Sequence, residues 1–339
     1  MRIALNGFGR IGKNFLRAVL LDKRASQALE IAAINVGKGD LQATALAFKY
    51  DSILGTYPGT VSYNNGSLAI DGKTIPLIQE LDPLKAPWSN HSIDWVVEAS
   101  GHFTSREGAS KHLTSGARNV LITAPAHDED ITIIPGVNNE AFLPDVHRIV
   151  SLGSCTSNAL FTVIKVAQDT FGIEQAYMTT VHAYTNTQPL LDVDSTVSDL
   201  RRGRAAGLNI VPTSSGAMKV VGRLMPELEG KLFGCSLRVP VAKVSLLDCT
   251  FFLQKAMTQE QFNKAFLDAS QTTMKGIIGY TDLPLVSSDY GGNSHSVTID
   301  SLMTEAHGST AKLFGWYDNE WGYSERLKDF LVFVAATHS

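Results

Sequence analysis

Residues 3–12 read IALNGFGRIG, an apolar run that leads into a glycine-rich turn. The turn matches GxGxxG at Gly7, Gly9 and Gly12. In this pattern the first glycine permits a tight turn, the second lets a pyrophosphate approach the backbone, and the third lets the following helix pack on the strand. The phosphates then lie at a helix N-terminus, where free N–H groups and the helix dipole favour anions. The stretch therefore predicts a dinucleotide-binding turn. The alternative is a structural turn without a ligand.

The sequence around this turn alternates between strand and helix patterns. Strands are predicted at 2–7, 31–35, 95–100 and 119–125, and helices at 9–24, 41–51 and 105–117. Such alternation predicts an α/β domain of the Rossmann type, with a doubly wound parallel sheet covered on both faces. Residues 57–81 break the pattern with short runs punctuated by glycine, and Asn65-Gly66 predicts a hairpin turn there.

The second half of the chain has a different pattern. Strands are predicted at 176–185, 231–243, 244–254, 295–300 and 311–318, and helices at 157–172, 214–228, 258–274 and 322–337. Long strands with few helices between them indicate an α+β domain with a mostly antiparallel sheet. We therefore expect a dinucleotide-binding domain over 1–153, joined by a C-terminal helix at 319–339, and a catalytic domain over 154–318.

Composition narrows the class of protein. A chain of 339 residues, 44% hydrophobic and 18% charged, is typical of a globular protein with two domains. The net charge of −4 and the absence of a basic stripe argue against nucleic-acid binding. No run approaches the roughly 20 apolar residues of a membrane span, and no signal peptide precedes the first strand. Three cysteines without CxxC spacing indicate a reducing compartment, so we expect a cytoplasmic protein.

Cys155 lies in SLGSCTSN and precedes a helical pattern. A helix N-terminus lowers the pKa of a thiol there, and its N–H groups stabilise an oxyanion formed by attack of the sulfur. This context predicts a nucleophile. The alternative, a buried structural cysteine, suits Cys235 and Cys249 better because both lie in apolar strand-like runs.

His182 ends an apolar strand pattern and opens the polar stretch AYTNTQ. A histidine within reach of Cys155 would form a thiolate–imidazolium pair, but taken alone His182 is more typical of a satisfied histidine at a strand end than of a catalytic one. No histidine or cysteine spacing indicates a metal site.

Cationic and hydroxyl side chains gather in the same half of the chain. Arg238 lies in an otherwise apolar strand, where an unpaired charge is costly, so it is a candidate anion ligand or a structural ion pair. The run DLRRGR at 199–204 is either a further anion site or a solvated loop. The stretch TSSG at 213–216 opens a predicted helix and either caps it or binds phosphate.

These motifs, in this order and over nearly the whole chain, resemble the phosphorylating glyceraldehyde-3-phosphate dehydrogenase family. NGFGRIG is similar to its cofactor turn, SCTSN to its nucleophile motif and HAYTNTQ to the stretch with its histidine. LRRGRAAGLNIVPTSSGAMK, MPELEGKL, RVP and WYDNEWGYS follow in the family's order. The resemblance implies a homotetramer, NAD or NADP as cofactor, and oxidation of glyceraldehyde 3-phosphate to 1,3-bisphosphoglycerate with inorganic phosphate. The same reaction runs in reverse in gluconeogenesis.

The resemblance also implies residue roles. Cys155 is the nucleophile that forms a hemithioacetal and then a thioester, and His182 is its base. Thr185 and Arg238 hold the substrate's phosphate, and the attacking phosphate binds to Ser154, Thr156, Ser215 and Gly216, with Arg204 near both. The implied cofactor residues are Gly7, Phe8, Gly9, Arg10, Ile11, Gly12, Asn35, Val36, Lys38, Ser100, Gly101, Thr123, Asn319 and Tyr323. The loop from about 183 to 207 resembles one that lies near a neighbouring subunit's cofactor.

Two positions depart from the family pattern at the expected cofactor site. Val36 replaces an aspartate that holds the adenosine ribose, and Leu81 replaces a common arginine. The loop stretch 192–195 also lacks the leucine–proline pair of many NAD-specific members. Loss of the aspartate removes a repulsion against a 2′-phosphate, and Lys38 adds a positive charge. We therefore expect NADP or dual use in preference to NAD alone.

Two other functions remain open at this point. Erythrose-4-phosphate dehydrogenase is the nearest relative of the family, although it usually departs from the HAYTN and TSTGA-type stretches that are kept here in close form. A nucleotide-binding protein without chemistry is the second alternative, but it needs neither Cys155 nor His182.

Overall fold

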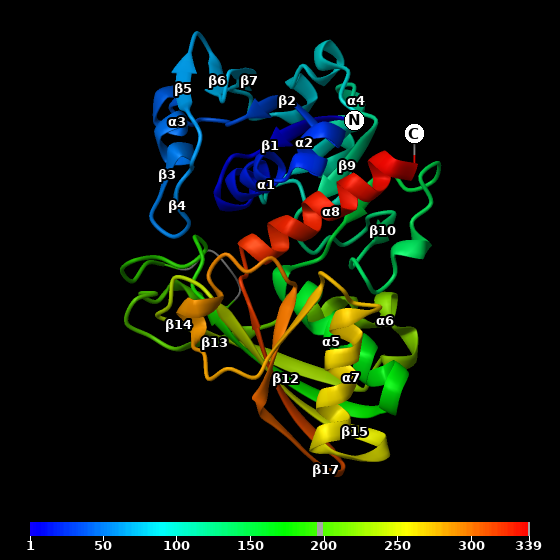
Figure 1. Cartoon of the computed structure of the whole chain (residues 1–339). Helices are drawn as coiled ribbons and strands as arrows, with labels where there is room; N and C mark the ends of the chain where they lie inside the picture. Colours follow the sequence, from blue (N-terminus) through cyan, green and yellow to red (C-terminus); the bar gives the residue numbers. More distant parts are fainter. Residues whose placement is uncertain (195–198, 338–339) are drawn as a thin grey trace. The chain divides into compact units, whose positions relative to one another are not determined.

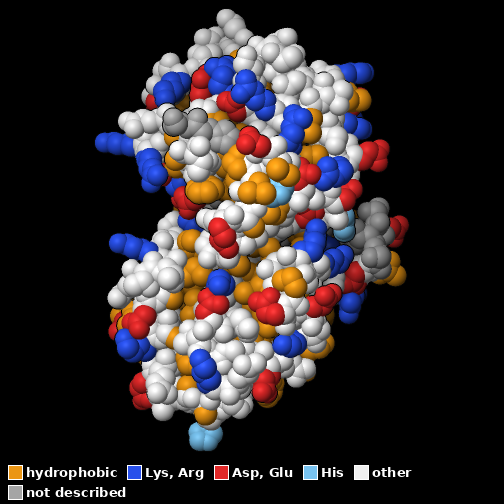
Figure 2. Space-filling model, turned by 90° about the vertical axis from the view of Figure 1, so that its right-hand side faces the viewer, with side chains coloured by type: hydrophobic (Ala, Val, Ile, Leu, Met, Phe, Trp, Pro, Cys, Tyr) orange, Lys and Arg blue, Asp and Glu red, His pale blue; other side chains and the backbone are white. Residues whose placement is uncertain are grey.

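The computed structural model describes residues 1–194 and 199–337. Part of the predicted loop at 183–207 therefore lies outside the described residues. The chain divides into two compact units, Met1–Gly153 with Ser324–Ser339, and Ser154–Tyr323 (Figure 1). The face drawn in Figure 2 carries interspersed acidic and basic side chains. Within the described residues, no helix is long and apolar enough to cross a membrane.

The first unit is built on a nine-stranded sheet in the order β10-β11-β9-β8-β1-β2-β7-β6-β5. Neighbours from β10 to β7 pair in parallel, and β7-β6-β5 form an antiparallel extension. The strands are β1 (Arg2–Asn6), β2 (Glu30–Asn35), β5 (Val61–Asn64), β6 (Ser67–Ile70), β7 (Lys73–Ile78), β8 (Trp95–Glu98), β9 (Asn119–Ile122), β10 (Ile131–Thr132) and β11 (Ile149–Ser151). β3 (Tyr50–Asp51) and β4 (Gly55–Thr56) form a separate ribbon. The predicted parallel sheet is confirmed.

The helices of this unit connect its strands, except the C-terminal helix, which follows the last strand of the second unit. They are α1 (Arg10–Leu21), α2 (Lys23–Ala28), α3 (Leu41–Lys49), α4 (Arg106–Thr114) and α8 (Trp321–Thr337), which starts in the second unit, with short 3-10 turns η1 (Pro83–Lys85), η2 (Trp88–His91) and η3 (Asn139–Ala141). The single helix predicted over 9–24 is wrong only at its end, where a break at Asp22 separates α1 from α2. α1 stops at Asp22, whose side chain accepts hydrogen bonds from the N–H groups of Arg24 and Ala25 and so starts α2.

The predicted hairpin in the antiparallel extension is confirmed. Asn65 and Gly66 connect β5 to β6 with φ of 46° and 80°. Positive φ at both central residues is the requirement of a type I′ turn, which asparagine and glycine meet at low cost.

The second unit contains a six-stranded sheet in the order β13-β14-β12-β15-β17-β16. Three of its five pairings are antiparallel, as expected. Its strands are β12 (Ile173–Ala183), β13 (Val211–Ser214), β14 (Leu232–Val239), β15 (Ser245–Thr258), β16 (Ile278–Thr281) and β17 (Val297–Tyr317). Its helices are α5 (Cys155–Phe171), α6 (Val221–Leu224) and α7 (Gln259–Gln271), with η4 (Leu200–Gly203), η5 (Gly216–Val220), η6 (Pro226–Leu228) and η7 (Ser287–Tyr290).

Two sequence predictions for this unit are wrong. The helix predicted over 214–228 is three short pieces, η5, α6 and η6, because Gly222 weakens a helix and Pro226 cannot continue one. The strands predicted at 295–300 and 311–318 belong to one 21-residue strand, β17. The polar segment between them lacks an alternating pattern, yet it continues the strand.

Candidate active site

A pocket of about 670 Å³ lies beside the glycine-rich turn in the first unit. The segments that follow β1, β2, β7 and β8 form its walls. β1 has β2 on one side and β8 on the other, so the strand order reverses there. Open α/β sheets bind ligands at the carboxyl ends of the strands at such a switch point. The pocket is therefore placed where a dinucleotide is expected.

The three glycines have the geometry that the motif requires. Gly7 has φ of +97°, and a Cβ there would lie 2.4 Å from the backbone nitrogen of Ser100. A Cβ on Gly12 would lie 2.3 Å from the carbonyl oxygen of Gly7, so this glycine lets helix and turn pack together. A Cβ on Gly9 would meet nothing within 4 Å. Gly9 also precedes α1 without a side-chain cap, which leaves N–H groups free for an anion.

The predicted cofactor residues fall into three groups. Those that line the pocket are Gly7, Gly9, Asn35, Val36, Lys38 and Ser100. Those in the same unit but outside its lining are Phe8, Arg10, Ile11, Gly12, Gly101 and Thr123. Asn319 and Tyr323 belong to the second unit. Leu81, which departs from the family pattern, also lines the pocket. The sequence predictions missed the remaining lining residues: Asn6, Gly37, Glu80, Ala99, His102 and Phe103.

In the second unit, Cys155 is the first residue of α5. Ser154 caps that helix, with its hydroxyl oxygen accepting a hydrogen bond from the N–H of Ser157 at 3.0 Å. His182 lies near the end of β12, and its Nε2 is 3.5 Å from Sγ of Cys155. The structure therefore brings the two predicted catalytic side chains into contact.

The hydrogen-bond partners of Nδ1 determine which tautomer the His182 ring adopts. Nδ1 lies 2.6 Å from the carbonyl oxygen of Ala183 and 2.8 Å from Nη1 of Arg238. The carbonyl only accepts and the guanidinium only donates, so a neutral ring can satisfy one of them. Nη1 of Arg238 also has the Ala183 carbonyl as an acceptor at 3.1 Å. We infer that Nδ1 carries the proton, which leaves Nε2 free to accept the proton of the Cys155 thiol.

The surroundings of the pair favour its neutral form. Burial and the charge of Arg238 lower the pKa of His182 to about 3, against the hydrogen bond to Ala183. Burial raises the pKa of the Cys155 thiol, although the charge of Arg238 and hydrogen bonds at Thr156 oppose it. The prediction that the helix N-terminus lowers this pKa is therefore wrong for the free protein, because burial outweighs the local donors.

Arg238 lies opposite His182 in the parallel register of β12 and β14. Burial lowers the pKa of its guanidinium. Its Nε is buried and has no hydrogen-bond partner among the described residues. A partly buried cation with an unused donor beside a nucleophile is suited to an anionic ligand.

The other predicted anion-binding residues have different surroundings. Ser215 caps η5, with its hydroxyl accepting from the N–H of Ala217, and Gly216 follows it. Thr185 hydrogen-bonds to the hydroxyl of Thr187 at 2.9 Å. Arg204 is exposed and its Nε donates to Asp192 at 2.8 Å. Arg202, rather than Arg204, approaches this group of side chains, because its Nη2 donates to Thr187 at 3.0 Å.

Two residues near the pair were missed by the sequence predictions. The hydroxyl of Tyr317 lies 3.0 Å from that of Thr156 and 2.6 Å from that of Thr180, and its ring packs edge-on against His182. Ser245 accepts a hydrogen bond from the N–H of Ala183 and donates to Oδ1 of Asn319, each at 3.1 Å. Ser245 thus connects the residue after His182 to Asn319. Both residues come from distant strands, and no local motif identifies them.

Comparison with known proteins agrees with this arrangement. The model of the glyceraldehyde 3-phosphate dehydrogenase NAD-binding domain matches residues 1–106, and that of the C-terminal domain of the same enzyme matches residues 154–319. A glyceraldehyde-3-phosphate dehydrogenase from Streptomyces coelicolor is 46% identical over 336 residues, which is 98% of each chain. Glyceraldehyde-3-phosphate dehydrogenase 1 from Bacillus subtilis is 45% identical over 99% of this chain and 98% of its own.

The fold, the pocket and these matches together define the class of this protein. The chain is an oxidoreductase with a nicotinamide cofactor. It belongs to the glyceraldehyde-3-phosphate dehydrogenase family.

Proposed function

We propose that this chain oxidises glyceraldehyde 3-phosphate to a thioester on Cys155. Inorganic phosphate then releases the product as 1,3-bisphosphoglycerate. The contact between Sγ of Cys155 and Nε2 of His182 carries the proposal. Nε2 takes the thiol proton as the sulfur attacks the aldehyde carbon, which gives a hemithioacetal. The N–H groups at the start of α5 stabilise the resulting oxyanion.

Oxidation and phosphate transfer complete the cycle. The nicotinamide cofactor supplies the hydride acceptor when it is bound. His182 gives the thiol proton to the oxyanion and takes it back from the resulting hydroxyl as the hydride leaves, and a thioester on Cys155 remains. Inorganic phosphate attacks the thioester carbon, the Cys155 sulfur leaves, and the acyl phosphate is released. The thioester retains energy that attack by water would lose.

Two anion sites fit this cycle. Thr185 and Arg238 are assigned to the phosphate of the substrate, and the unpartnered Nε of Arg238 supports the assignment. Ser154, Thr156, Ser215 and Gly216 are assigned to the attacking phosphate. We assign Arg204 a minor role in anion binding because its guanidinium already pairs with Asp192. We propose that Arg202, which donates to Thr187, interacts with the anions as they enter the site.

We also propose that the cofactor site accepts NADP, alone or together with NAD. Val36 and Lys38 line the pocket after β2, and no side-chain hydrogen bond or ion pair engages Lys38 within the described part of the chain. Glu80 is the one carboxylate in the described lining. It turns back to accept hydrogen bonds from the N–H groups of Leu81 and Asp82 at 2.8 and 3.0 Å. Glu80 keeps its charge, but its Oε1 is directed to these backbone donors, and position 36 carries no carboxylate that would repel a 2′-phosphate.

A homotetramer is the assembly we propose. An exposed aromatic cluster on the sheet of the second unit supports association: Tyr177 of β12 stacks on Phe233 of β14 and meets Phe252 of β15 edge-on. These rings are 47%, 43% and 39% exposed. Large apolar groups that gather on an open sheet face are typical of an interface. Light scattering of the purified protein tests the mass, and Tyr177→Glu is expected to lower it.

One assay tests the proposed reaction. Reduction of NAD and of NADP is followed separately with glyceraldehyde 3-phosphate, with and without phosphate, and erythrose 4-phosphate replaces the aldehyde in a parallel series. A higher kcat/KM for erythrose 4-phosphate would reassign the substrate. A protein that binds nucleotide but reduces neither cofactor with either aldehyde would have no such activity.

A further inference from the structure

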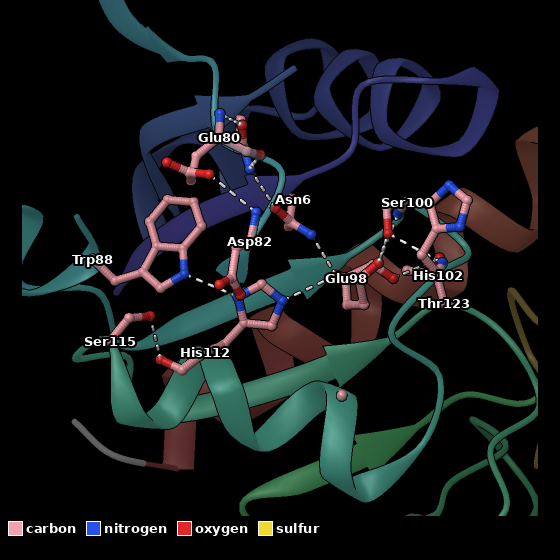
Figure 3. Close-up of polar contacts among 12 residues, drawn as sticks. Asn6, Glu80, Asp82, Trp88, Glu98, Ser100, His102, His112, Ser115 and Thr123 are labelled. Carbon is pink, nitrogen blue, oxygen red and sulfur yellow. Dashed lines mark hydrogen bonds and ion pairs between the residues drawn. The ribbon is translucent and has the colours of Figure 1, made fainter. Parts of the chain in front are cut away.

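Glu98, the last residue of β8, carries a carboxylate that is fully buried. Its Oε1 accepts hydrogen bonds from the backbone N–H of Ser100 at 2.8 Å and from the Ser100 hydroxyl. Its Oε2 accepts from Nδ2 of Asn6 at 2.6 Å and lies 3.0 Å from Nε2 of His112 (Figure 3). Four donors around one buried carboxylate compensate for its removal from water and support its charged form.

The tautomer of His112 follows from its other neighbour. The indole N–H of Trp88 lies 2.9 Å from Nδ1 of His112 (Figure 3). An indole nitrogen only donates, so Nδ1 accepts and the ring proton is on Nε2. Nε2 therefore donates to Glu98. Neither side chain of the Glu98–His112 pair is exposed, so water cannot supply an alternative partner.

The donor and acceptor roles in this network also determine how two residues of the pocket wall are oriented. A carboxylate only accepts, so Asn6 must present Nδ2 to Glu98 and Oδ1 to Nδ2 of Asn35, which lies 2.7 Å away. Asn35 then presents its own Oδ1 to the backbone N–H groups of Gly37 and Glu80 at 3.1 and 3.0 Å. These two bonds hold the segments that follow β2 and β7.

The members of this network lie in two layers. Asn6, Asn35 and Ser100 line the pocket, whereas Glu98 and His112 do not. Ser100 is also the residue whose backbone nitrogen limits Gly7 to glycine. The carboxylate is thus connected to the turn, to β2 and to the end of β8, but it does not reach the pocket itself.

We propose that Glu98 is a positioning residue for nucleotide binding. It orients the Asn6 and Asn35 amides and so fixes the wall that receives the adenosine end of the cofactor, and His112 and Trp88 hold it in place. The inference rests on the proposed dinucleotide binding, and it predicts an effect on ligands that lack nicotinamide. Calorimetric titration with AMP and with ADP-ribose measures that effect without any turnover.

Glu98→Gln is the direct test because it keeps the shape of the side chain. In one orientation its NH2 group faces the N–H of Ser100, and in the other it faces the donors of Asn6 and His112. A buried donor remains unpaired in both cases. We expect Kd for AMP and for ADP-ribose to rise by about tenfold or more, with KM for the aldehyde and kcat at saturating cofactor within twofold of wild type. Glu107→Gln, the same change at an exposed position of α4, is the matched control and should bind as wild type.

A second pair of variants decides the question if Glu98→Gln fails to fold. His112→Gln retains a donor for Glu98 and an acceptor for Trp88, and His112→Leu retains neither. We expect wild-type affinity for AMP from the first and a loss similar to that of Glu98→Gln from the second. Unchanged Kd values in Glu98→Gln and His112→Leu would overturn the proposal, even with lowered stability. So would a loss confined to ligands that carry nicotinamide. An inactive wild type that binds AMP would contradict the proposed reaction only.

Discussion

Sγ of Cys155 lies 3.5 Å from Nε2 of His182, and burial raises the pKa of the thiol and lowers the pKa of the imidazole. The two residues are 27 positions apart and belong to α5 and β12. A neutral thiol beside a neutral imidazole is stable until an aldehyde arrives. Proton transfer to Nε2 then accompanies attack by the sulfur, so the nucleophile forms where it is used.

Replacement of the sulfur tests its role. Cys155→Ser is expected to lower kcat by at least about 10³-fold, since a serine hydroxyl in the same place is a much poorer nucleophile. Nucleotide affinity should not change. Cys235→Ser is the matched control because Cys235 is an exposed cysteine of β14. Steady-state kinetics with aldehyde, phosphate and cofactor provide the measurement, and more than a tenth of wild-type kcat in Cys155→Ser would rule out this nucleophile.

The ionisation of the Cys155–His182 pair determines how the rate of alkylation of Cys155 depends on pH. The pKa of the Cys155 thiol is raised above its usual 9.0 and that of His182 is lowered to about 3, so little thiolate is present near neutral pH. The rate of alkylation by iodoacetamide in the free protein should therefore rise continuously from pH 6 to pH 9, with Cys155→Ser as the blank. A rate that reaches a plateau by pH 7 would mean that a thiolate–imidazolium pair exists before the substrate binds.

Cofactor preference is expected to depend on charge at position 36. Val36→Asp places a carboxylate in the pocket wall, where it repels a 2′-phosphate and accepts hydrogen bonds from ribose hydroxyls. We expect kcat/KM for NADP to fall by about tenfold or more relative to that for NAD. Val36→Asn introduces a side chain of nearly the same shape as aspartate but without its charge. It therefore separates the effect of charge repulsion from the effect of side-chain size. Equal NADP kinetics in all three proteins would show that position 36 does not face the ribose.

Tyr317 is expected to support the pair through its hydroxyl. Tyr317→Phe keeps the ring that packs against His182 but leaves the hydroxyls of Thr156 and Thr180 without this partner. The loss of these buried hydrogen bonds should lower the free energy of unfolding by about 1–3 kcal/mol. Urea unfolding at pH 7.5 measures this, and a change below 0.5 kcal/mol would contradict the network. Tyr50→Phe, which removes the hydroxyl from an exposed ring away from the proposed interface, is the control.

Local sequence was sufficient to predict features whose structural cause lies within one short segment. Gly7 and Gly12 each have a separate steric reason within a single turn, whereas a Cβ on Gly9 would meet nothing within 4 Å. Cys155 was recognisable from its polar neighbours and the helix that follows. Its raised pKa was not, because that depends on burial by distant segments.

Contacts between distant strands could not be predicted in this way. Arg238 lies opposite His182 only through the register of β12 and β14, and Tyr317 reaches Thr156 from the far end of β17. The apolar spacing of 214–228 indicated one helix, although Pro226 cannot continue a helix beyond α6. Glu98 and His112 belong to patterns that fit an ordinary strand and helix, so their shared role needed the structure.

The most direct test of the account is a single-turnover measurement without phosphate. Protein, cofactor and glyceraldehyde 3-phosphate are mixed rapidly, and the reduced cofactor is followed by absorbance. We expect a burst of at most one equivalent per Cys155, no burst in Cys155→Ser, and continuous turnover only after inorganic phosphate is added. Continuous turnover without phosphate, or a burst that survives in Cys155→Ser, would contradict a thioester at this residue that is released by attack of phosphate.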